Sequence, residues 1–240
     1  VPAGDDNLVY RAAVSFLESR GEALRLEIAL RKRIPAAAGL GGGSSDAGAV
    51  LRTLDAEVGG VPPEALAEVA LRLGADVPFF LDPRPARVRG IGERIDPLPD
   101  LPDLAVLLVH PGTELATAAV FGAYAAGDRG ACRPEPRSPV HELRRFAQTG
   151  RHTPELEGVL QNDLEAAAWR LCPALDPLRD RLREAGAETM AMSGSGPTLY
   201  ALFPTFEAAR EVHDRLGPLL EAHQQRWLTK TVRRPAECVT

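Results

Sequence analysis

The opening of the chain shows two different hydrophobic periods. Over residues 8–19, apolar side chains recur every three or four positions, which predicts a helix with one buried side, capped by an acidic or amide side chain at 5–7. Over residues 24–31, apolar and polar positions alternate, which predicts a β-strand with one buried face that ends at Pro35. Helical spacing returns over residues 47–58, directly before a Gly–Gly pair that stops the helix.

The remaining pattern predicts more helices and five further strands. A proline pair begins a helix that Gly74 ends, and helical spacing dominates residues 114–185 around a polar loop at 127–139. The other predicted elements are strands at 86–89, 104–110, 188–192, 198–203 and 227–232 and a helix at 206–216.

The order of these elements predicts the fold of the second half. From residue 104 onward it is strand, helices, strand, strand, helix, strand, which is the split βαβ or ferredoxin-like order enlarged by extra helices. A Pro-rich stretch at 97–102 is the candidate boundary, so we expect one domain over 1–99 and another over 100–240.

The strongest chemical signal is a glycine-rich loop between the predicted strand and helix. Gly39–Ser45 reads Gly-Leu-Gly-Gly-Gly-Ser-Ser, and glycines let backbone amides approach a phosphate without a side chain in the way. The helix expected after Ser44 offers free N–H groups and a positive dipole end. The loop is not a Walker motif, because no lysine follows the glycines, and it lacks the third glycine of a Rossmann loop. Two alternatives remain at this point: a flexible loop, or a helix start with glycines for close packing.

Composition narrows the class of protein. Of the 240 residues, 45% are hydrophobic and 25% charged, and the net charge is −5, which disfavours nucleic acid as a partner. Cys132, Cys172 and Cys238 are odd in number and far apart, which argues against a disulfide framework or a structural zinc and favours a cytoplasmic location. The longest apolar run, 104–109, is too short to span a membrane, so we expect no membrane partner.

Three ordered motifs together resemble the GHMP kinases. Pro35–Ser45 is similar to the family's central Pro-x-x-x-Gly-Leu-Gly-x-x-Ser motif, in the triple-glycine form typical of the branch that phosphorylates 4-diphosphocytidyl-2-C-methylerythritol. Leu73–Phe80 resembles the segment that carries the catalytic aspartate, and Met192–Pro197 resembles the glycine-rich third motif. The similarity runs over essentially the whole chain.

The resemblance implies a fold and a reaction. The fold would be α+β: a two-domain GHMP kinase fold with an incomplete N-terminal domain like ribosomal protein S5 and a ferredoxin-like C-terminal domain with extra helices. The reaction would move the ATP γ-phosphoryl group, with Mg²⁺, to the 2-hydroxyl of the cytidyl substrate, while Asp76 takes the hydroxyl proton. From the residues alone, Asp76 is alternatively a helix-end aspartate in a turn. Ser44 or Ser45 would assist the metal. The residues implied to hold the ATP phosphates are Pro35, Gly39, Leu40, Gly41, Gly42, Gly43, Ser44 and Ser45.

The resemblance also implies a substrate pocket. Ile91, Thr117 and Phe121 would line it, with Phe121 against the cytosine ring or, alternatively, in the protein core. Gly194, Ser195 and Gly196 would lie near the transferred phosphoryl group or, alternatively, form a plain hairpin turn. The segment Asn162–Glu165 resembles a helix motif of the family and is interpreted as structural.

The chain departs from the family at its start. The family's early Ala-Lys-x-Asn and Gly-Tyr-His motifs have no counterpart here, so we expect the chain of 240 residues to be catalytically impaired and unstable by itself. The competing functions are another GHMP activity, of the mevalonate, homoserine or galactose type, and a non-catalytic nucleotide-binding fragment. The sequence predicts no oligomeric state.

Overall fold

Two units of packing make up the protein. The computed structural model describes residues 4–21, 24–127 and 139–232. The first unit is built mainly from Val1–Ala36 and Gly41–Pro99, and the second from Ala37–Leu40 and Asp100–Val232. The glycine-rich loop is therefore divided between the two units after Leu40.

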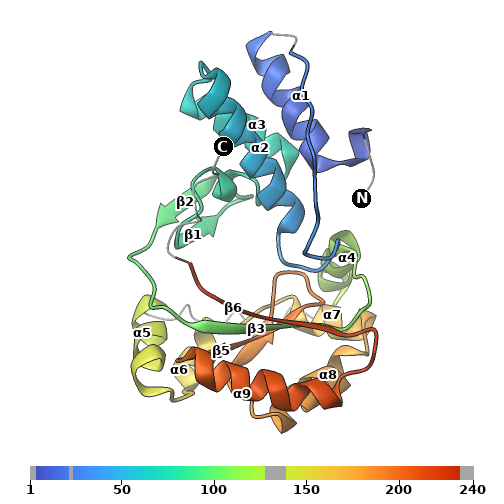
Figure 1. The fold of residues 1–240 in the computed structure, drawn as a ribbon, viewed down its shortest axis with the longest axis vertical. Coiled ribbons are helices and arrows are strands. Elements are labelled where there is room, and N and C mark those ends of the chain that lie inside the picture. Colours follow the sequence, from blue (N-terminus) through green and yellow to red (C-terminus); the bar gives the residue numbers. More distant parts are fainter. Residues whose placement is uncertain (1–3, 22–23, 128–138, 233–240) are drawn as a thin grey trace. The chain divides into compact units, whose positions relative to one another are not determined.

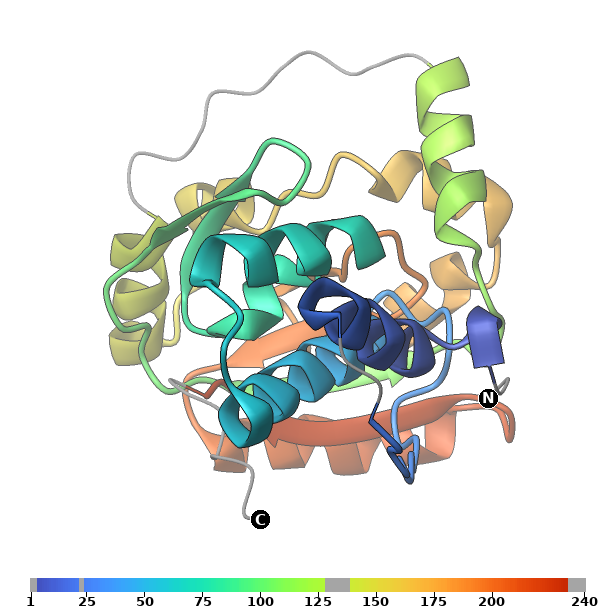
Figure 2. The ribbon, with the colours of Figure 1, turned by 90° about the horizontal axis from the view of Figure 1, so that it is seen from above.

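Three helices form the core of the first unit. Helices α1 (Leu8–Arg20), α2 (Gly42–Val58) and α3 (Pro63–Leu73) pack side by side (Figures 1 and 2). Their apolar faces meet in one core in which Phe16 and Leu51 are fully buried. The three predicted helices are confirmed, because periodic apolar side chains bury one face of each.

The ends of α1 follow directly from its sequence. The side chain of Asn7 accepts a hydrogen bond from the N–H of Val9 at 3.0 Å, which confirms the predicted cap. Gly21 ends the helix in the left-handed conformation, at φ 66°, which glycine adopts without steric cost.

The strand predicted at 24–31 is wrong. Residues 24–33 form no β-strand, and the apolar side chains Leu24, Leu26, Ile28 and Leu30 are 36–44% exposed. Alternation produces a strand only where a neighbouring segment takes the backbone hydrogen bonds, and no segment of the described chain does so here. All residues from 24 to 31 are exposed, so the predicted buried face is also wrong within the described residues.

Short elements complete the first unit. A 3₁₀ turn, η1 (Gly4–Asp6), precedes α1, and a second, η2 (Pro78–Leu81), follows α3. Strands β1 (Ala86–Arg89) and β2 (Arg94–Pro97) form an antiparallel hairpin. Strand β1 was predicted, whereas β2 was not, because only Ile95 in it is apolar and half-buried.

A four-stranded antiparallel sheet forms the centre of the second unit. Its strands are β3 (Ala105–His110), β4 (Met190–Met192), β5 (Leu199–Phe203) and β6 (Gln225–Lys230). They lie in the order β4-β5-β3-β6, with Leu107 paired to Ala201 on one side and to Leu228 on the other. This is the ferredoxin-like order that the sequence predicted.

Helices cover both faces of this sheet, and the mainly helical character predicted for residues 114–185 is confirmed within the described residues. On one face, alternate residues of β3 pack against α7 (Glu165–Leu171), α8 (Leu175–Glu184), α9 (Phe206–Leu216) and the inner side of α4 (Thr117–Ala126). On the other face, Leu104 and Leu202 pack against α5 (Pro139–Thr149) and α6 (Pro154–Val159). A 3₁₀ turn, η3 (Gly217–Leu219), follows α9, which runs along the sheet in Figures 1 and 2.

Candidate active site

The N-terminus of α2 presents backbone N–H groups that no side chain caps. The helix begins at Gly42, earlier than predicted, and Gly41 caps it in the left-handed conformation with φ 63°. The first helical hydrogen bond runs from the Ser45 N–H to the Gly41 carbonyl at 2.8 Å, and no side chain caps the helix. The N–H groups ahead of Ser45 are therefore free to bind a ligand, and the helix dipole favours an anion there. Apolar periodicity missed this first turn because glycine has no side chain that reveals a pattern.

Glycines on α2 also let another segment pack against it. A Cβ atom on Gly48 would lie 2.4 Å from the Cβ of Phe80, and one on Gly41 would lie 3.4 Å from the Phe80 ring. Arg52 of α2 donates a hydrogen bond to the Phe80 carbonyl. The packing alternative for the glycines thus holds at Gly48, while Gly41–Gly43 carry the free amides. Turn η2 is fastened to α2 by these contacts.

Asp76 lies in the turn between α3 and η2. The turn is anchored by Val77, which is fully buried and whose N–H donates to the Gly74 carbonyl at 3.1 Å. Asp76 itself is exposed, and within the described chain it forms no hydrogen bond or ion pair. Its carboxylate is accordingly free to meet a ligand, while η2 ties it to the helix that carries the glycine loop.

The β1–β2 turn lies against this aspartate turn. A Cβ atom on Gly92 would lie 1.8 Å from the Ala75 carbonyl oxygen, so only glycine permits this approach. The adjacent Ile91 is 71% exposed. The structure therefore brings together the segments that carry Ile91 and Asp76, two of the residues predicted to lie in one site.

Lys32, which the sequence analysis did not select, lies beside the start of α2. Its ammonium group pairs with Asp46 on the first turns of α2, and it lies 3.3 Å from the position of a Cβ atom on Gly42. It therefore places a cation beside the free amides. The signal in the sequence was weak, because a single lysine before a proline is found on many loops.

In the second unit, the turn after β4 meets the short segment Ala37–Leu40. The hydroxyl of Ser193 donates to the Gly39 carbonyl at 2.8 Å. A Cβ atom on Gly39 would lie 2.5 Å from the carbonyl oxygens of both Ser193 and Gly196, so glycine is required there. Two of the predicted glycine motifs, far apart in sequence, are therefore in direct contact.

The start of α4 joins the same cluster. The Thr117 and Ser195 hydroxyls form a hydrogen bond at 2.9 Å, which brings two predicted substrate residues together. Phe121, one turn further on, is 53% exposed, so the alternative that it is a core phenylalanine is wrong. Thr117 is exposed as well, whereas Ser195 is buried. The turn is thus more than a plain hairpin connection, because residues from two other segments hold it.

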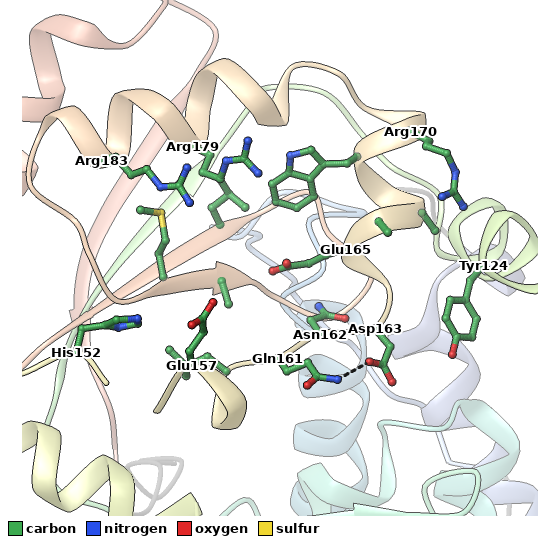
Figure 3. Close-up of a pocket in the computed structure, with 17 residues that line it drawn as sticks. Tyr124, His152, Glu157, Gln161, Asn162, Asp163, Glu165, Arg170, Arg179 and Arg183 are labelled. Atoms are coloured by element: carbon green, nitrogen blue, oxygen red, sulfur yellow. Dashed lines mark hydrogen bonds between the residues drawn. The ribbon is translucent and has the colours of Figure 1, made fainter. Parts of the chain in front are cut away.

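Behind this turn, the second unit has a polar cavity of about 790 Å³ (Figure 3). None of the predicted site residues lines it. Its wall includes Asn162 and Glu165, which flank the start of α7 and both bond to the backbone of Met192. Burial raises the pKa of the Glu165 carboxyl, partly offset by the hydrogen bond from the Met192 N–H. Burial and the charge of Glu165 raise the pKa of Tyr200 to about 12.

Three further observations concern metals, membranes and thiols. Within residues 4–21, 24–127 and 139–232, no cluster of three His, Cys, Asp or Glu side chains is placed to hold a metal ion. In the same residues, no helix combines the length and the apolar character needed to cross a membrane. Cys172 is free and buried. Cys132 and Cys238 lie outside the described residues, and so does the loop predicted at 127–139 except for its two end residues.

Two family models of known proteins match the chain and identify the class of protein. Residues 7–82 match the family model for the N-terminal domain of GHMP kinases, and residues 137–220 match the model for the C-terminal domain. Together with the fold, these matches define an ATP-dependent small-molecule kinase of the GHMP type. A crystal structure of a homoserine kinase from Cytophaga hutchinsonii, 20% identical, shares this fold with a TM-score of 0.68 over 98% of this chain and 78% of that one.

More similar relatives then give the family. A 4-diphosphocytidyl-2-C-methyl-D-erythritol kinase from Geobacter sp. (strain M21) is 38% identical over 88% of this chain and 71% of its own length. A crystal structure of 4-(cytidine 5'-diphospho)-2C-methyl-D-erythritol kinase is 37% identical, with a TM-score of 0.78 over 96% of this chain and 80% of that one. The chain belongs to the 4-diphosphocytidyl-2-C-methyl-D-erythritol kinase family, which confirms the resemblance seen in its motifs.

Proposed function

We propose that the protein transfers the γ-phosphoryl group of ATP to the 2-hydroxyl of 4-diphosphocytidyl-2-C-methyl-D-erythritol. The observation that carries this choice of substrate is the 37–38% identity to proteins of that name over 88–96% of the chain. The homoserine kinase, at 20% identity, shares only the fold.

The first unit supplies the proposed phosphate site. The free N–H groups at the start of α2, from Gly41 to Ser44, bind phosphate oxygens, and Lys32 adds a positive charge. Pro35 and the Gly39–Leu40 segment set the path of the loop into this helix. Phosphoryl transfer depends on positioning and on neutralising charge, and this arrangement provides both.

Asp76 is the proposed base. Its exposed carboxylate, unpaired in the described chain, orients the acceptor hydroxyl and takes its proton. The η2 contacts with α2 keep it in the unit that holds the phosphate site. Ile91, from the neighbouring turn, and the second unit's Thr117 and Phe121 are proposed to contact the cytidyl substrate, and Gly194–Gly196 the phosphoryl group.

Magnesium fits this site as a companion of ATP. Mg²⁺ is usually bound by substrate phosphates and few protein groups, so the lack of a preformed acidic cluster in the described residues is compatible with it. The hydroxyls of Ser44 and Ser45 form no hydrogen bond to other described residues, so either is free to assist the ion. When bound, the ion neutralises phosphate charge.

We also propose the boundaries and the roles of two domains. Residues 1–99 belong to the ATP-binding domain and residues 100–240 to the C-terminal GHMP kinase domain. The change of packing unit at Pro99 supports this boundary. Because ATP is its substrate, we place the enzyme in the cytoplasm.

The test is turnover by the purified full-length protein. ADP release is measured with ATP and the cytidyl substrate, and in parallel with mevalonate, homoserine and galactose. We expect turnover only with the cytidyl substrate. Asp76→Asn should lower kcat by about 10²–10⁴-fold, since a general base contributes that much. Asp82→Asn, at the other end of η2 and paired with Arg84, is the matched control and should keep kcat.

Two results would contradict the proposal. Turnover with one of the other acceptors would assign a different GHMP activity. Binding of ATP with no turnover of any acceptor would support the non-catalytic alternative.

A further inference from the structure

Four carbonyl groups around the Ser193–Pro197 turn accept hydrogen bonds from protein groups. Ser193 O accepts from the Gly196 N–H at 2.9 Å, and Gly39 O accepts from the Ser193 hydroxyl at 2.8 Å. Asn162 takes the other two: its Nδ2 donates to Met192 O at 2.9 Å and to Gly194 O at 2.7 Å. This pairing favours anion binding at the turn, because a carbonyl oxygen directed at the anion would repel it.

The amide of Asn162 can lie in only one orientation. Its Oδ1 accepts from the Leu164 N–H at 3.0 Å, at the start of α7, while both Nδ2 hydrogens point to carbonyl oxygens. A flipped amide would place its oxygen against two carbonyl oxygens. Glu165, three residues on, accepts from the Met192 N–H at 2.8 Å and secures the same strand end.

The grip on Gly194 O decides where the next N–H points. A trans peptide is planar, with its C=O and N–H directed to opposite sides. Because the Gly194 carbonyl is directed at Asn162, which lines the cavity in Figure 3, the Ser195 N–H is directed to the side of this peptide opposite Asn162. Within the described chain, neither the Ser195 nor the Gly194 N–H has an acceptor. The Thr117 hydroxyl fixes the Ser195 side chain from the start of α4.

We infer that Asn162 is a positioning residue for phosphoryl transfer, which aims the Ser195 N–H at a phosphoryl oxygen of the bound substrates. This assignment rests on the proposed kinase function. It gives the segment Asn162–Glu165, interpreted from sequence as structural, a specific effect on the reaction. Asn162 itself touches no substrate, since it acts on the side of the turn that faces the cavity.

The deciding variant is Asn162→Asp. It keeps the shape and the Oδ1 acceptor for Leu164, but it removes both donors and turns a carboxylate oxygen toward two carbonyls. The turn should rotate, and kcat should fall about 10²-fold, the loss expected when one hydrogen-bond donor to a developing anion is removed. The KM for the cytidyl substrate should stay within about twofold of the wild type, because the substituted side chain is not proposed to contact the substrate. The Tm should stay close to that of the wild type.

Gln161→Glu is the matched control. It makes the same amide-to-carboxylate change one residue earlier, in the wall of the same cavity, at a side chain bonded only to Asp163 among described residues. Its kcat should remain within about twofold of the wild type. Equal losses in both variants would overturn the inference, because they would show a general charge effect. A loss in Asn162→Asp that only tracks a lower Tm would overturn it as well.

A second measurement needs no variant. In the ¹⁵N-labelled full-length protein, the Ser195 amide resonance should shift on addition of magnesium with a non-hydrolysable ATP analogue and the cytidyl substrate, while the Gln161 amide should not. An unchanged Ser195 resonance at saturation would refute the inference. This readout does not require turnover, so a protein that binds nucleotide but fails the kinase assay would end the proposed function and still test whether the Ser195 N–H meets a bound ligand.

Discussion

Replacing Gly48 by alanine tests how η2 is held against α2. In an ordinary helix interior, alanine is more stable than glycine by about 0.5–1 kcal/mol. At Gly48, however, the new Cβ would lie 2.4 Å from the Phe80 Cβ and 3.0 Å from the Phe80 carbonyl oxygen. These atoms belong to a backbone segment and the stem of a side chain, so relief requires η2 to move.

The magnitudes favour destabilisation. Overpacking a close contact costs about 1–3 kcal/mol, which exceeds the helix gain, so we expect a net loss of about 1–2 kcal/mol. For a chain of this length that corresponds to a fall in Tm of about 2–8 °C. Because η2 adjoins Asp76, kcat should fall more than stability accounts for at the assay temperature.

The assays are thermal unfolding by circular dichroism, hydrogen exchange of α2 amides and steady-state turnover. Gly158→Ala is the matched control, since Gly158 is also helical and has nothing within 4 Å of its Cβ position. It should raise stability by about 0.5–1 kcal/mol and leave turnover unchanged. The reasoning is refuted if Gly48→Ala stabilises the protein as much as Gly158→Ala does.

Three other expectations follow from individual side chains. Lys32→Met should raise the KM for ATP about tenfold, because a hydrogen bond to a charged group is lost and Asp46 is left without its partner near the phosphates. Lys32→Met combined with Asp46→Asn should recover part of the loss. An unchanged KM in Lys32→Met would exclude Lys32 from the site. Burial raises the pKa of Glu165, so the folded state binds this proton more tightly than the unfolded state, and stability falls as pH rises from about 4.5 through the folded pKa. Glu165→Gln keeps an acceptor for the Met192 N–H, and the Tm of this variant relative to the wild type should increase as pH rises through that range. A Tm difference that does not change with pH would contradict this cause. Burial also raises the pKa of the Cys172 thiol, so the peptide containing it should react with iodoacetamide at pH 8 far more slowly in the folded than in the unfolded protein, as measured by mass spectrometry.

Local chemistry along the chain predicted most of the elements. The structure confirms the cap at Asn7, the proline start and Gly74 end of α3, and the strand predicted from the apolar run at 104–109, and each of these signals involves neighbours within a few residues. The segment 24–31 failed because a strand needs a partner, and period alone does not supply one. The start of α2 was misplaced because its first residues are glycines without a periodic side chain.

The candidate site, like the fold, was predicted in part from the sequence and in part only from the tertiary structure. Composition alone singled out the glycine loop, because glycines let backbone amides approach a phosphate, whereas Asp76 and the turn at Ser193 were selected only by their resemblance to motifs of the family. The contacts of Gly39 with Ser193, of Thr117 with Ser195, and of Asn162 with the turn carbonyls join residues 30 to 154 positions apart. Such pairs arise only when separate segments pack, since a hydrogen bond depends on distance and direction in space and leaves no periodic trace along the chain.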